Sequence, residues 1–415
     1  MQLPSTKYID KTFWAIFILL VFVATVALAS ASSTLVYSTG NALGPLMKQV
    51  MWFIVGIIGA FCVQYVPSRF IRMGGYLVLL ISLFCLYVML IPHNPFVVTI
   101  NGAGRWFNLF GFRFQPSELA KLSLIIVVAD MLSRIRKEED KRHYFFLTLG
   151  ITAATILPIL LGNLSTAILL AGIIFLMWIL ARIPWKYTAS TAAIAMGVLV
   201  GGYFIAKTCE KHGIGLGPFS RAITWVHRID DMVAEHQAPE DDTFVINDDN
   251  YQRSMAKVAI ARGGKSPIGV LPGNSQERDY LPLAYADYIF AIIVEETGII
   301  GAIGLIFLYL AILFRACWAS SRYEDYAAIF MVMGLALMLT GQALVSMMVA
   351  VGLGPVTGQP LPLISRGGTS VIITSLYFGI MMAVSREQAE RKGLETETVN
   401  QSWGDVPDIV IEDQE

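Results

Sequence analysis

The sequence predicts an all-α, polytopic membrane protein with about ten transmembrane helices. Of its 415 residues, 55% are hydrophobic and only 15% are charged, and the mean hydropathy is +0.62. A soluble domain carries about 25% charged residues. Apolar runs long enough to cross about 30 Å of hydrocarbon recur along the whole chain. The ten runs cover approximately residues 12–36, 46–66, 74–92, 116–133, 144–162, 165–181, 187–206, 284–314, 326–351 and 365–385.

The positions of Lys and Arg predict the orientation of these spans. With the N-terminus inside and the spans alternating, short inner segments contain 16 of the 30 basic residues. Short outer loops contain very few, chiefly Lys48, Arg105, Arg113 and Arg366. Because cytoplasmic loops are enriched in Lys and Arg, we expect both termini to be cytoplasmic. The net charge of −1 gives no indication of nucleic-acid binding, and no nucleic-acid partner is expected.

The chain is predicted to form one membrane domain, residues 1–385, followed by an acidic cytoplasmic tail, residues 386–415. The tail has few apolar residues, so we expect it to be disordered. The first apolar run ends in "ALASAS", which resembles a signal-cleavage site, but it is longer than a typical signal core and we expect it to be retained. The four cysteines show no paired spacing, so neither a disulfide framework nor a zinc site is predicted.

The loop and helix start between the third and fourth runs read "NGAGRWFNLFGFRFQPSELAKLSLII". Pro116 suits the first position of a helix, and Glu118 then falls in the first turn, where the helix dipole favours an anion. Lys121 follows on the same face, so the two can pair. They are either a solvated ion pair at an ordinary helix start or a buried pair that shapes a cavity. We favour the buried pair, because Lys121 lies a full turn inside an apolar helix.

Arg105 and Arg113 precede this helix and are flanked by Trp106 and Phe114. These arginines could bind an anionic lipid headgroup. They could equally be interfacial anchors whose charged ends reach toward water.

A large outer loop, residues 207–283, is predicted between the seventh and eighth helices. Its middle, "DDMVAEHQAPEDDTFVINDDN", is acidic but lacks the spacing of an EF-hand calcium loop, so we expect a mobile insertion. The next stretch alternates glycines with basic residues, a composition that suits a pyrophosphate through charge and exposed backbone N–H groups. The basic residues are Arg253, Lys257, Arg262, Lys265 and Arg278.

The eighth run brings three carboxylates to a membrane helix. Asp287 lies at its outer end, whereas Glu295 and Glu296 lie roughly 12–14 Å deeper. An ionised acid at the bilayer centre costs roughly 2.5–3.5 kcal/mol on insertion scales, so such residues usually face protein or a polar cavity. We expect chemistry from Asp287 and structural polar contacts from the two glutamates.

The last outer loop, "GLGPVTGQPLPLISRGGTS", is rich in Pro and Gly at membrane depth. Irregular backbone is tolerated there only where it is buried in protein or lines a watery cavity. Three loops on one side of the membrane therefore predict an outward-facing polar cavity.

Three separated motifs resemble the SEDS family of bacterial wall synthesis, the RodA, FtsW and SpoVE proteins, and are most like the FtsW branch. They are "RFQPSELAK" at 113–121, "GNS" before "DYIFAIIVEETG" at 287–298, and "PLPLISRGGTS" at 360–370. The resemblance covers roughly residues 12–386. It implies a peptidoglycan glycosyltransferase of the cytoplasmic (inner) membrane that polymerises lipid II at the outer face, during septum formation in cell division. Its implied partners are lipid II, a class B penicillin-binding transpeptidase and other division proteins.

The resemblance also implies site residues. Asp287 falls on the family's essential aspartate, and Glu118 and Lys121 on its salt bridge. Arginines or a divalent cation, Mg2+ or Mn2+, would neutralise the leaving pyrophosphate. The residues expected to bind substrate or line its cavity are Arg105, Arg113, Gln115, Ser117, Glu118, Lys121, Arg253, Lys257, Arg262, Asn274, Ser275, Ser365, Gly367, Gly368 and Ser370.

The chain departs from the family pattern at three places. The family often has Glu-x-His-Thr-Asp at residues 283–287, Pro-Asp-Leu/Phe-Gly-Thr at residues 162–166, and Tyr at Arg366, where this chain reads Leu-Ala-Tyr-Ala-Asp, Gly-Asn-Leu-Ser-Thr and Arg. This chain therefore lacks the Glu and His that the family often has just before the aspartate, and Asp287 is the candidate base without them.

Two alternative functions are a lipid-precursor flippase or transporter and a non-catalytic scaffold of the division machinery. A transporter needs polar groups that reach both faces, whereas the polar loops here belong to the outer side. A partner helix is expected to dock on small residues of the eighth and ninth helices, at 298–304 and 334–348, with Gly334 and Ala343 in the contact.

Overall fold

The protein is helical almost throughout. The computed structural model describes residues 8–31, 43–91, 94–100, 103–109, 112–137, 141–212, 221–237, 251–277 and 286–404. Within these ranges twelve helices and one small sheet are present. The helices are α1 (Lys11–Ala31), α3 (Leu43–Val63), α4 (Ser68–Val88), α5 (Pro116–Lys137), α6 (Lys141–Gly162), α7 (Leu164–Leu180), α8 (Trp185–Lys211), α9 (Arg221–Gln237), α10 (Tyr251–Gly263), α11 (Ile289–Ser320), α12 (Tyr326–Ala350) and α13 (Thr369–Gly404).

Each of the ten predicted spans coincides with one of these helices, which confirms the all-α, multi-pass membrane class. Eight of the described helices are long and apolar enough to cross a membrane. The other two predicted spans are α7, which has 17 residues, and α5, which carries several charges. Because α5 packs against α4, α6, α7 and α12, its charged residues Glu118, Lys121 and Asp130 are buried in protein.

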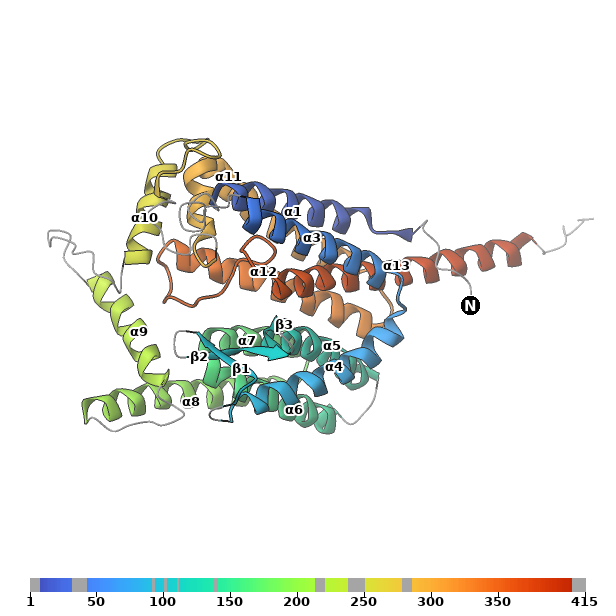
Figure 1. Cartoon of the computed structure of the whole chain (residues 1–415). Helices are drawn as coiled ribbons and strands as arrows, with labels where there is room; N and C mark the ends of the chain where they lie inside the picture. Colours follow the sequence, from blue (N-terminus) through green and yellow to red (C-terminus); the bar gives the residue numbers. More distant parts are fainter. Residues whose placement is uncertain are drawn as a thin grey trace, which may run out of the picture.

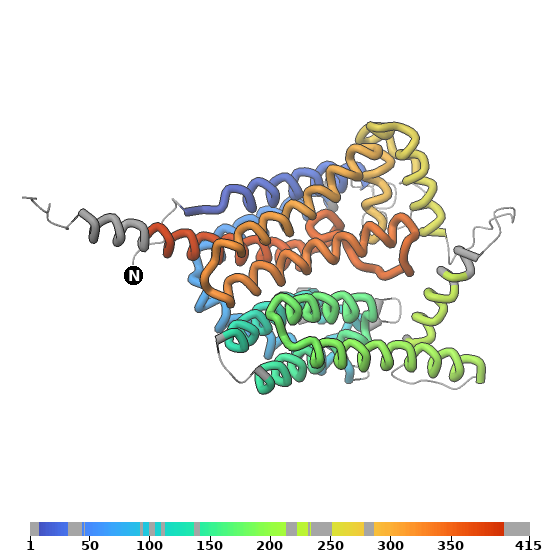
Figure 2. The backbone as a smooth tube through the Cα atoms, turned by 180° about the vertical axis from the view of Figure 1, so that it is seen from behind, coloured from blue at the N-terminus to red at the C-terminus, as the bar shows by residue number. Residues whose placement is uncertain are grey.

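Figures 1 and 2 show the helices in two groups. One contains α1, α3, α11 and α13, and the other contains α4 to α8. The central helix α12 packs against α11 and α13 on one side and against α5 and α7 on the other. At one end of the bundle lie α9 and α10, whereas α13 projects from the opposite end (Figure 1).

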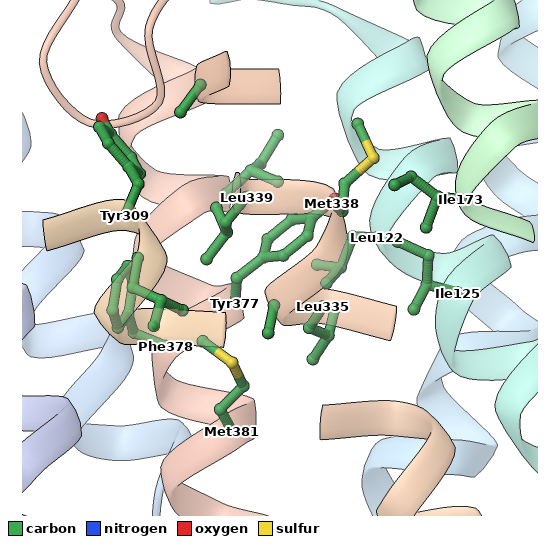
Figure 3. Close-up of a cluster of buried hydrophobic side chains, with 14 of the residues drawn as sticks. Leu122, Ile125, Ile173, Tyr309, Leu335, Met338, Leu339, Tyr377, Phe378 and Met381 are labelled. Carbon is green, nitrogen blue, oxygen red and sulfur yellow. The ribbon is translucent and has the colours of Figure 1, made fainter. Parts of the chain in front are cut away.

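Apolar side chains fill the centre of the bundle between these groups. Figure 3 shows Leu122 of α5, Leu339 of α12 and Tyr377 of α13 within one buried cluster. Large apolar side chains also cover the outside, for example Phe84 and Phe314. An apolar exterior is expected of a surface that faces lipid chains.

Residues 97–114, treated as loop in the sequence analysis, form an antiparallel sheet in the described ranges. Its strands are β1 (Val97–Ile100), β2 (Ala103–Leu109) and β3 (Phe112–Phe114), in the order β1-β2-β3. Gly104 pairs with Thr99 and Trp106 with Val98, so Arg105 is an extra residue on β2. Such a bulge bends its strand and re-aims the side chain that it carries.

Helix α13 continues without a break past residue 385, so the expected disorder of the tail is wrong for residues 386–404. Ion pairs one helical turn apart stabilise this extension, namely Arg386 with Glu390 at 2.9 Å and Arg391 with Glu387 at 2.7 Å. The rest of the tail, residues 405–415, lies outside the described residues. The acidic insertion expected at 230–250 is helical up to Gln237, and its remainder is also outside them.

Helix α11 is kinked at Gly298, whose φ of 67° and ψ of −162° are not helical. A Cβ at this position would collide with the backbone of Pro267 and Gly269. The glycine therefore allows the segment that follows α10 to pack directly on the α11 backbone, where Val270 donates to the Glu295 carbonyl at 3.0 Å. This contact positions two of the three carboxylates.

The docking site expected at Gly334 and Ala343 is wrong. A Cβ on Gly334 would lie 2.7 Å from Ile125 Cγ2 and 2.8 Å from Met177 Sδ, so this glycine packs α12 against its own α5 and α7. Ala343 is fully buried. In contrast, Gly304 of α11 has open space around it and is exposed.

Candidate active site

Asp287 lies two residues before α11 begins and faces the last loop, residues 351–368. A Cβ on Gly358 would lie 3.7 Å from Asp287 Oδ2 and 3.8 Å from Arg105 Nη1, so both charged groups approach the same point of this loop. Gly358 has a φ of +60°, a left-handed conformation that a side chain disfavours. The loop thus presents bare backbone to the carboxylate and the guanidinium.

Two arginines from distant segments are held beside this loop. Arg105, at the bulge of β2, donates from Nε to the Gly162 carbonyl at 3.3 Å. Arg228 of α9 donates from Nη1 to the Val356 carbonyl at 2.7 Å. Backbone carbonyls therefore hold both guanidinium groups near Asp287.

Burial raises the pKa of the Asp287 carboxyl above its ordinary value, while the positive charges of Arg105 and Arg228 lower it in part. A carboxylate that is partly shielded from water beside nearby cations is a stronger base than an exposed aspartate. This electrostatic arrangement is typical of catalytic acids and bases.

Ser365 connects the last loop to the start of α11. Its hydroxyl donates to the Ala286 carbonyl at 2.5 Å and accepts from the Leu361 N–H at 2.8 Å. The Tyr309 hydroxyl of α11 donates to the Pro362 carbonyl at 2.5 Å and so fixes the same loop at a second point. The peptide before Asp287 is thereby held in place.

The predicted Glu118–Lys121 pair is present and buried. Lys121 Nζ lies 2.7 Å from Glu118 Oε1, and its side chain is only 1% exposed. Lys121 also donates to Gln342 Oε1 at 2.9 Å, and Gln342 Nε2 donates to the Pro360 carbonyl at 3.0 Å. The pair thus supports the last loop, two residues from Gly358.

The helix start before this pair is ordered as the sequence predicts. Pro116 is the first residue of α5, and Glu118 lies in its first turn. Gln115 Nε2 donates to Ser117 Oγ at 2.9 Å. Gln115 and Ser117 therefore organise the N-terminus of α5 beside the sheet that carries Arg105.

Residues 162–166, where the chain departs from the pattern of the family that it resembles, also belong to this network. Asn163 caps α7 by accepting from the Thr166 N–H at 3.3 Å. The Thr166 hydroxyl accepts from Gln359 Nε2 at 2.6 Å. Gln359 follows Gly358, so α7 fixes the loop from another direction.

Glu295 and Glu296 make the structural polar contacts that the sequence analysis expected. Glu295 is 0% exposed and accepts from the Ser275 hydroxyl and from the Gln276 N–H at 3.1 Å. Glu296 accepts from Ser30 and from the Gly273 N–H at 3.1 Å. The "GNS" motif thus wraps around the two glutamates.

Several residues expected to bind pyrophosphate lie at these glutamates rather than at Asp287. Ser275 contacts Glu295, and Arg262 Nη1 lies 3.8 Å from Glu295 Oε1. Asn274 is exposed and donates to the Val270 carbonyl at 3.2 Å. The structure gives each of these three a contact within the protein.

The other predicted residues lie at the last loop, inside α10 or on the surface. Lys257 of α10 lies against Gly352 at the start of the last loop, and Arg253 is buried in α10. Arg113 is exposed on β3. At the end of the loop, a Cβ on Gly368 would lie 3.2 Å from the Trp52 ring, and Gly367 adjoins Ser370.

Sequence reasoning missed Arg228, Gly358 and Gln359 as individual residues. The last loop was singled out by its Pro and Gly content, which is the signal that could have pointed to Gly358. Arg228 carries no local signal, because only its packing beside Val356 brings it to the site.

The structure also bears on metal binding. Among the described residues, no group of three or more His, Cys, Asp or Glu side chains could hold a metal ion.

The fold and this site define a polytopic membrane protein with a partly buried carboxylate set near two arginines at one end of its helical bundle. Residues 10–390 match the sequence model of the FtsW/RodA/SpoVE family, described as cell cycle proteins. The chain belongs to this family.

Curated relatives cover most of the chain. A probable peptidoglycan glycosyltransferase FtsW from Enterococcus hirae is 31% identical over 95% of this chain and 96% of its own. A probable peptidoglycan glycosyltransferase FtsW from Saccharophagus degradans is 31% identical over 83% of this chain and 85% of its own. A solved chain from a peptidoglycan synthase complex has the same fold, with a TM-score of 0.69, 24% identity, and coverage of 92% of this chain and 99% of its own.

Proposed function

We propose that this chain is a peptidoglycan glycosyltransferase that polymerises lipid II, with Asp287 as general base. The relatives named above support the enzyme class. The observation that carries the assignment is the convergence of Asp287 and Arg105 on Gly358, with Arg228 held on the same loop. A base can accept the proton of the acceptor hydroxyl, and cations can stabilise the leaving pyrophosphate in glycosyl transfer.

In the proposed reaction, an acceptor sugar hydroxyl attacks the anomeric carbon of a lipid-linked donor. The new glycosidic C–O bond forms while the bond to the undecaprenyl pyrophosphate breaks, and the hydroxyl proton moves to an Asp287 carboxylate oxygen. Arg105 and Arg228 stabilise the negative charge that develops on the leaving pyrophosphate. The raised pKa of Asp287 favours proton uptake.

The expected divalent cation, Mg2+ or Mn2+, remains part of the proposal. Mg2+ often binds to one or two carboxylates together with substrate phosphates. The described residues fit only that form of binding, since they contain no cluster able to hold the ion alone. Asp287 would then be the protein ligand, and the ion would add positive charge at the pyrophosphate. No step above depends on it.

We place Asp287 on the outer side of the cytoplasmic membrane and both termini in the cytoplasm. The support is the bias of Lys and Arg toward short segments at the opposite end of the helices. A one-sided site favours an enzyme over a flippase, because the apolar cluster in Figure 3 fills the bundle centre. FtsW names among the relatives support a role in septum formation with other division proteins.

A class B penicillin-binding transpeptidase is the proposed partner. The solved neighbour comes from a complex that coordinates polymerisation with crosslinking, which supports a crosslinking enzyme beside this one. We place the partner's single membrane helix on the exposed face of α11, where Gly304 lies between the exposed Ile303 and Phe307. A glycine on a lipid-facing surface allows close approach of another helix.

Purified protein incubated with lipid II, with and without the transpeptidase, tests the proposal directly. We expect glycan strands from the wild type and none from Asp287→Asn, which keeps the size of the side chain but removes the base. The Asp287→Asn protein should elute and melt as the wild type does. Near-normal polymer from this variant would sink the assignment, and uptake of lipid II into vesicles without polymerisation would favour the flippase.

A further inference from the structure

A polar pocket lies at the end of α11 opposite Asp287. Asp287 and Arg315 are separated by 28 residues, roughly 40 Å along a helix. The pocket has a volume of about 270 Å³ and lies between the last turns of α11, the turn that leads to α12, and α13 beyond Ser385. It shares no residue with the site at Asp287.

Three basic side chains line this pocket, and no carboxylate is among its lining residues. They are Arg315, Arg322 and Lys392. Arg315 is anchored by Asp10, through Nε at 3.2 Å and Nη2 at 2.5 Å, and Ser385 donates to the same carboxylate at 2.7 Å. Asp10 neutralises the charge of Arg315 from behind, and the charge of Arg322 keeps the lining of the pocket positive.

One buried hydrogen-bond donor of the pocket, Arg315 Nη1, makes no hydrogen bond within the part of the chain that the structure describes. The Tyr323 hydroxyl is also buried and has no partner of good hydrogen-bond geometry there, although Ser385 lies close enough to lower its pKa in part. Burial raises the pKa of Tyr323 to about 12, so its hydroxyl keeps its proton and remains a donor. Buried donors without a protein partner point to a bound acceptor or water.

Trp318 holds the two guanidinium groups together. Arg322 Cζ lies 3.5 Å and Arg315 Cζ 4.4 Å from the centre of its ring. Arg322 has no acidic partner among the described residues. Two like charges on one indole repel each other, and an anion between them would relieve that repulsion.

An apolar surface leads from this pocket along the outside of α11. Phe314, which precedes Arg315, is 76% exposed, and Leu310 is exposed one turn further along. Acyl chains would lie on such a surface, whereas a soluble anion has no apolar part that could contact it. Basic pockets between transmembrane helices on the cytoplasmic side commonly bind phospholipid headgroups.

We propose that this pocket binds the phosphate group of an anionic phospholipid in the membrane leaflet at the end of the bundle opposite Asp287. The phosphate oxygens accept from Arg315 Nη1 and the Tyr323 hydroxyl and lie between Arg322 and Lys392. A zwitterionic choline headgroup would bring a further cation to the same place. The pocket therefore selects anionic headgroups and joins α13 to α11 through the lipid.

Native mass spectrometry of the full-length protein in detergent tests this selectivity. The probes are dioleoylphosphatidylglycerol and dioleoylphosphatidylcholine, which have the same acyl chains. The test variant is Arg322→Gln/Lys392→Gln, both exposed residues. The matched control is Arg69→Gln/Lys186→Gln, which removes two exposed cations outside the pocket. We expect wild type and control to retain phosphatidylglycerol roughly tenfold or more in preference to phosphatidylcholine, and the test variant to lose that preference.

A parallel measurement of Tm in inorganic phosphate distinguishes a lipid from a soluble anion. With a lipid ligand, phosphatidylglycerol raises the Tm of the wild type and the control but not of the test variant, and phosphate has no effect. A rise with phosphate and none with lipid would overturn the lipid assignment. The same phosphatidylglycerol preference in the test variant and the control would overturn the site itself.

Discussion

The Ser365 hydroxyl donates a hydrogen bond of 2.5 Å to the carbonyl oxygen of Ala286. Ala286 directly precedes Asp287, and Ser365 belongs to the last loop, residues 351–368. The position of the proposed base therefore depends on a contact between two segments that are 79 residues apart in the sequence.

Replacing Ser365 with Ala should lower kcat about tenfold and change KM for lipid II little. The Ala286 carbonyl and the Leu361 N–H would lose their partner, at a cost of about 1–3 kcal/mol for each unsatisfied group. Asp287 would then be held less firmly. Steady-state polymerisation rates check this, with Ser375→Ala, another buried serine, as the control. An unchanged kcat in Ser365→Ala would remove the positioning role.

The positive charge of Arg105 should set the acid side of the pH–rate profile. Asp287 must be ionised to accept a proton, its pKa is raised by burial, and Arg105 lowers that pKa in part. Arg105→Gln should therefore raise the pKa further and move the acid limb of the profile to higher pH, in addition to any overall loss of rate.

Polymerisation rates between about pH 5 and 9 measure this shift, on a scale where one pKa unit corresponds to about 1.4 kcal/mol. Arg113→Gln is the matched control, because Arg113 lies exposed on the neighbouring strand. An acid limb that stays in place, or moves to lower pH, in Arg105→Gln contradicts the arrangement.

Replacing one member of the Glu118–Lys121 pair should lower the Tm more than replacing both members. Each single alanine variant leaves a buried charge without its partner, which costs about 3–5 kcal/mol in measured cases. The double variant Glu118→Leu/Lys121→Met leaves no charge and should have a higher Tm than either single variant. Thermal unfolding in detergent checks the order, and single variants with wild-type Tm and activity would show that the pair is dispensable.

A bulky residue at Gly304 should weaken binding of the proposed transpeptidase partner and leave basal polymerisation unchanged. Gly304→Trp fills open space on the exposed face of α11, so the chain itself has no reason to unfold. Co-purification of the two membrane proteins measures the effect. Gly197→Trp, at an equally open glycine on α8, is the control. Equal recovery of the partner with both variants would rule out this docking face.

Local features of the sequence determined the class of the protein, the helices at its ten predicted spans and the pair at the start of α5. Hydropathy over about 20 residues decides whether a segment can cross a membrane. The helix period places Lys121 beside Glu118 whatever the rest of the fold does. The motif around Asp287 likewise marked the candidate base before any helix was packed.

Only the tertiary structure decided which cations face that base. Arg228 and Gly358 reach Asp287 from segments that no local spacing connects to it, and Ser275 turns to Glu295 because the kink at Gly298 brings its loop there. The sequence predicted that Gly334 contacts a partner helix. In the structure its small size instead allows α12 to pack against α5 and α7. Periodicity shows which face of a helix is apolar or small, but the neighbour that covers this face is set by contacts between residues far apart in the chain.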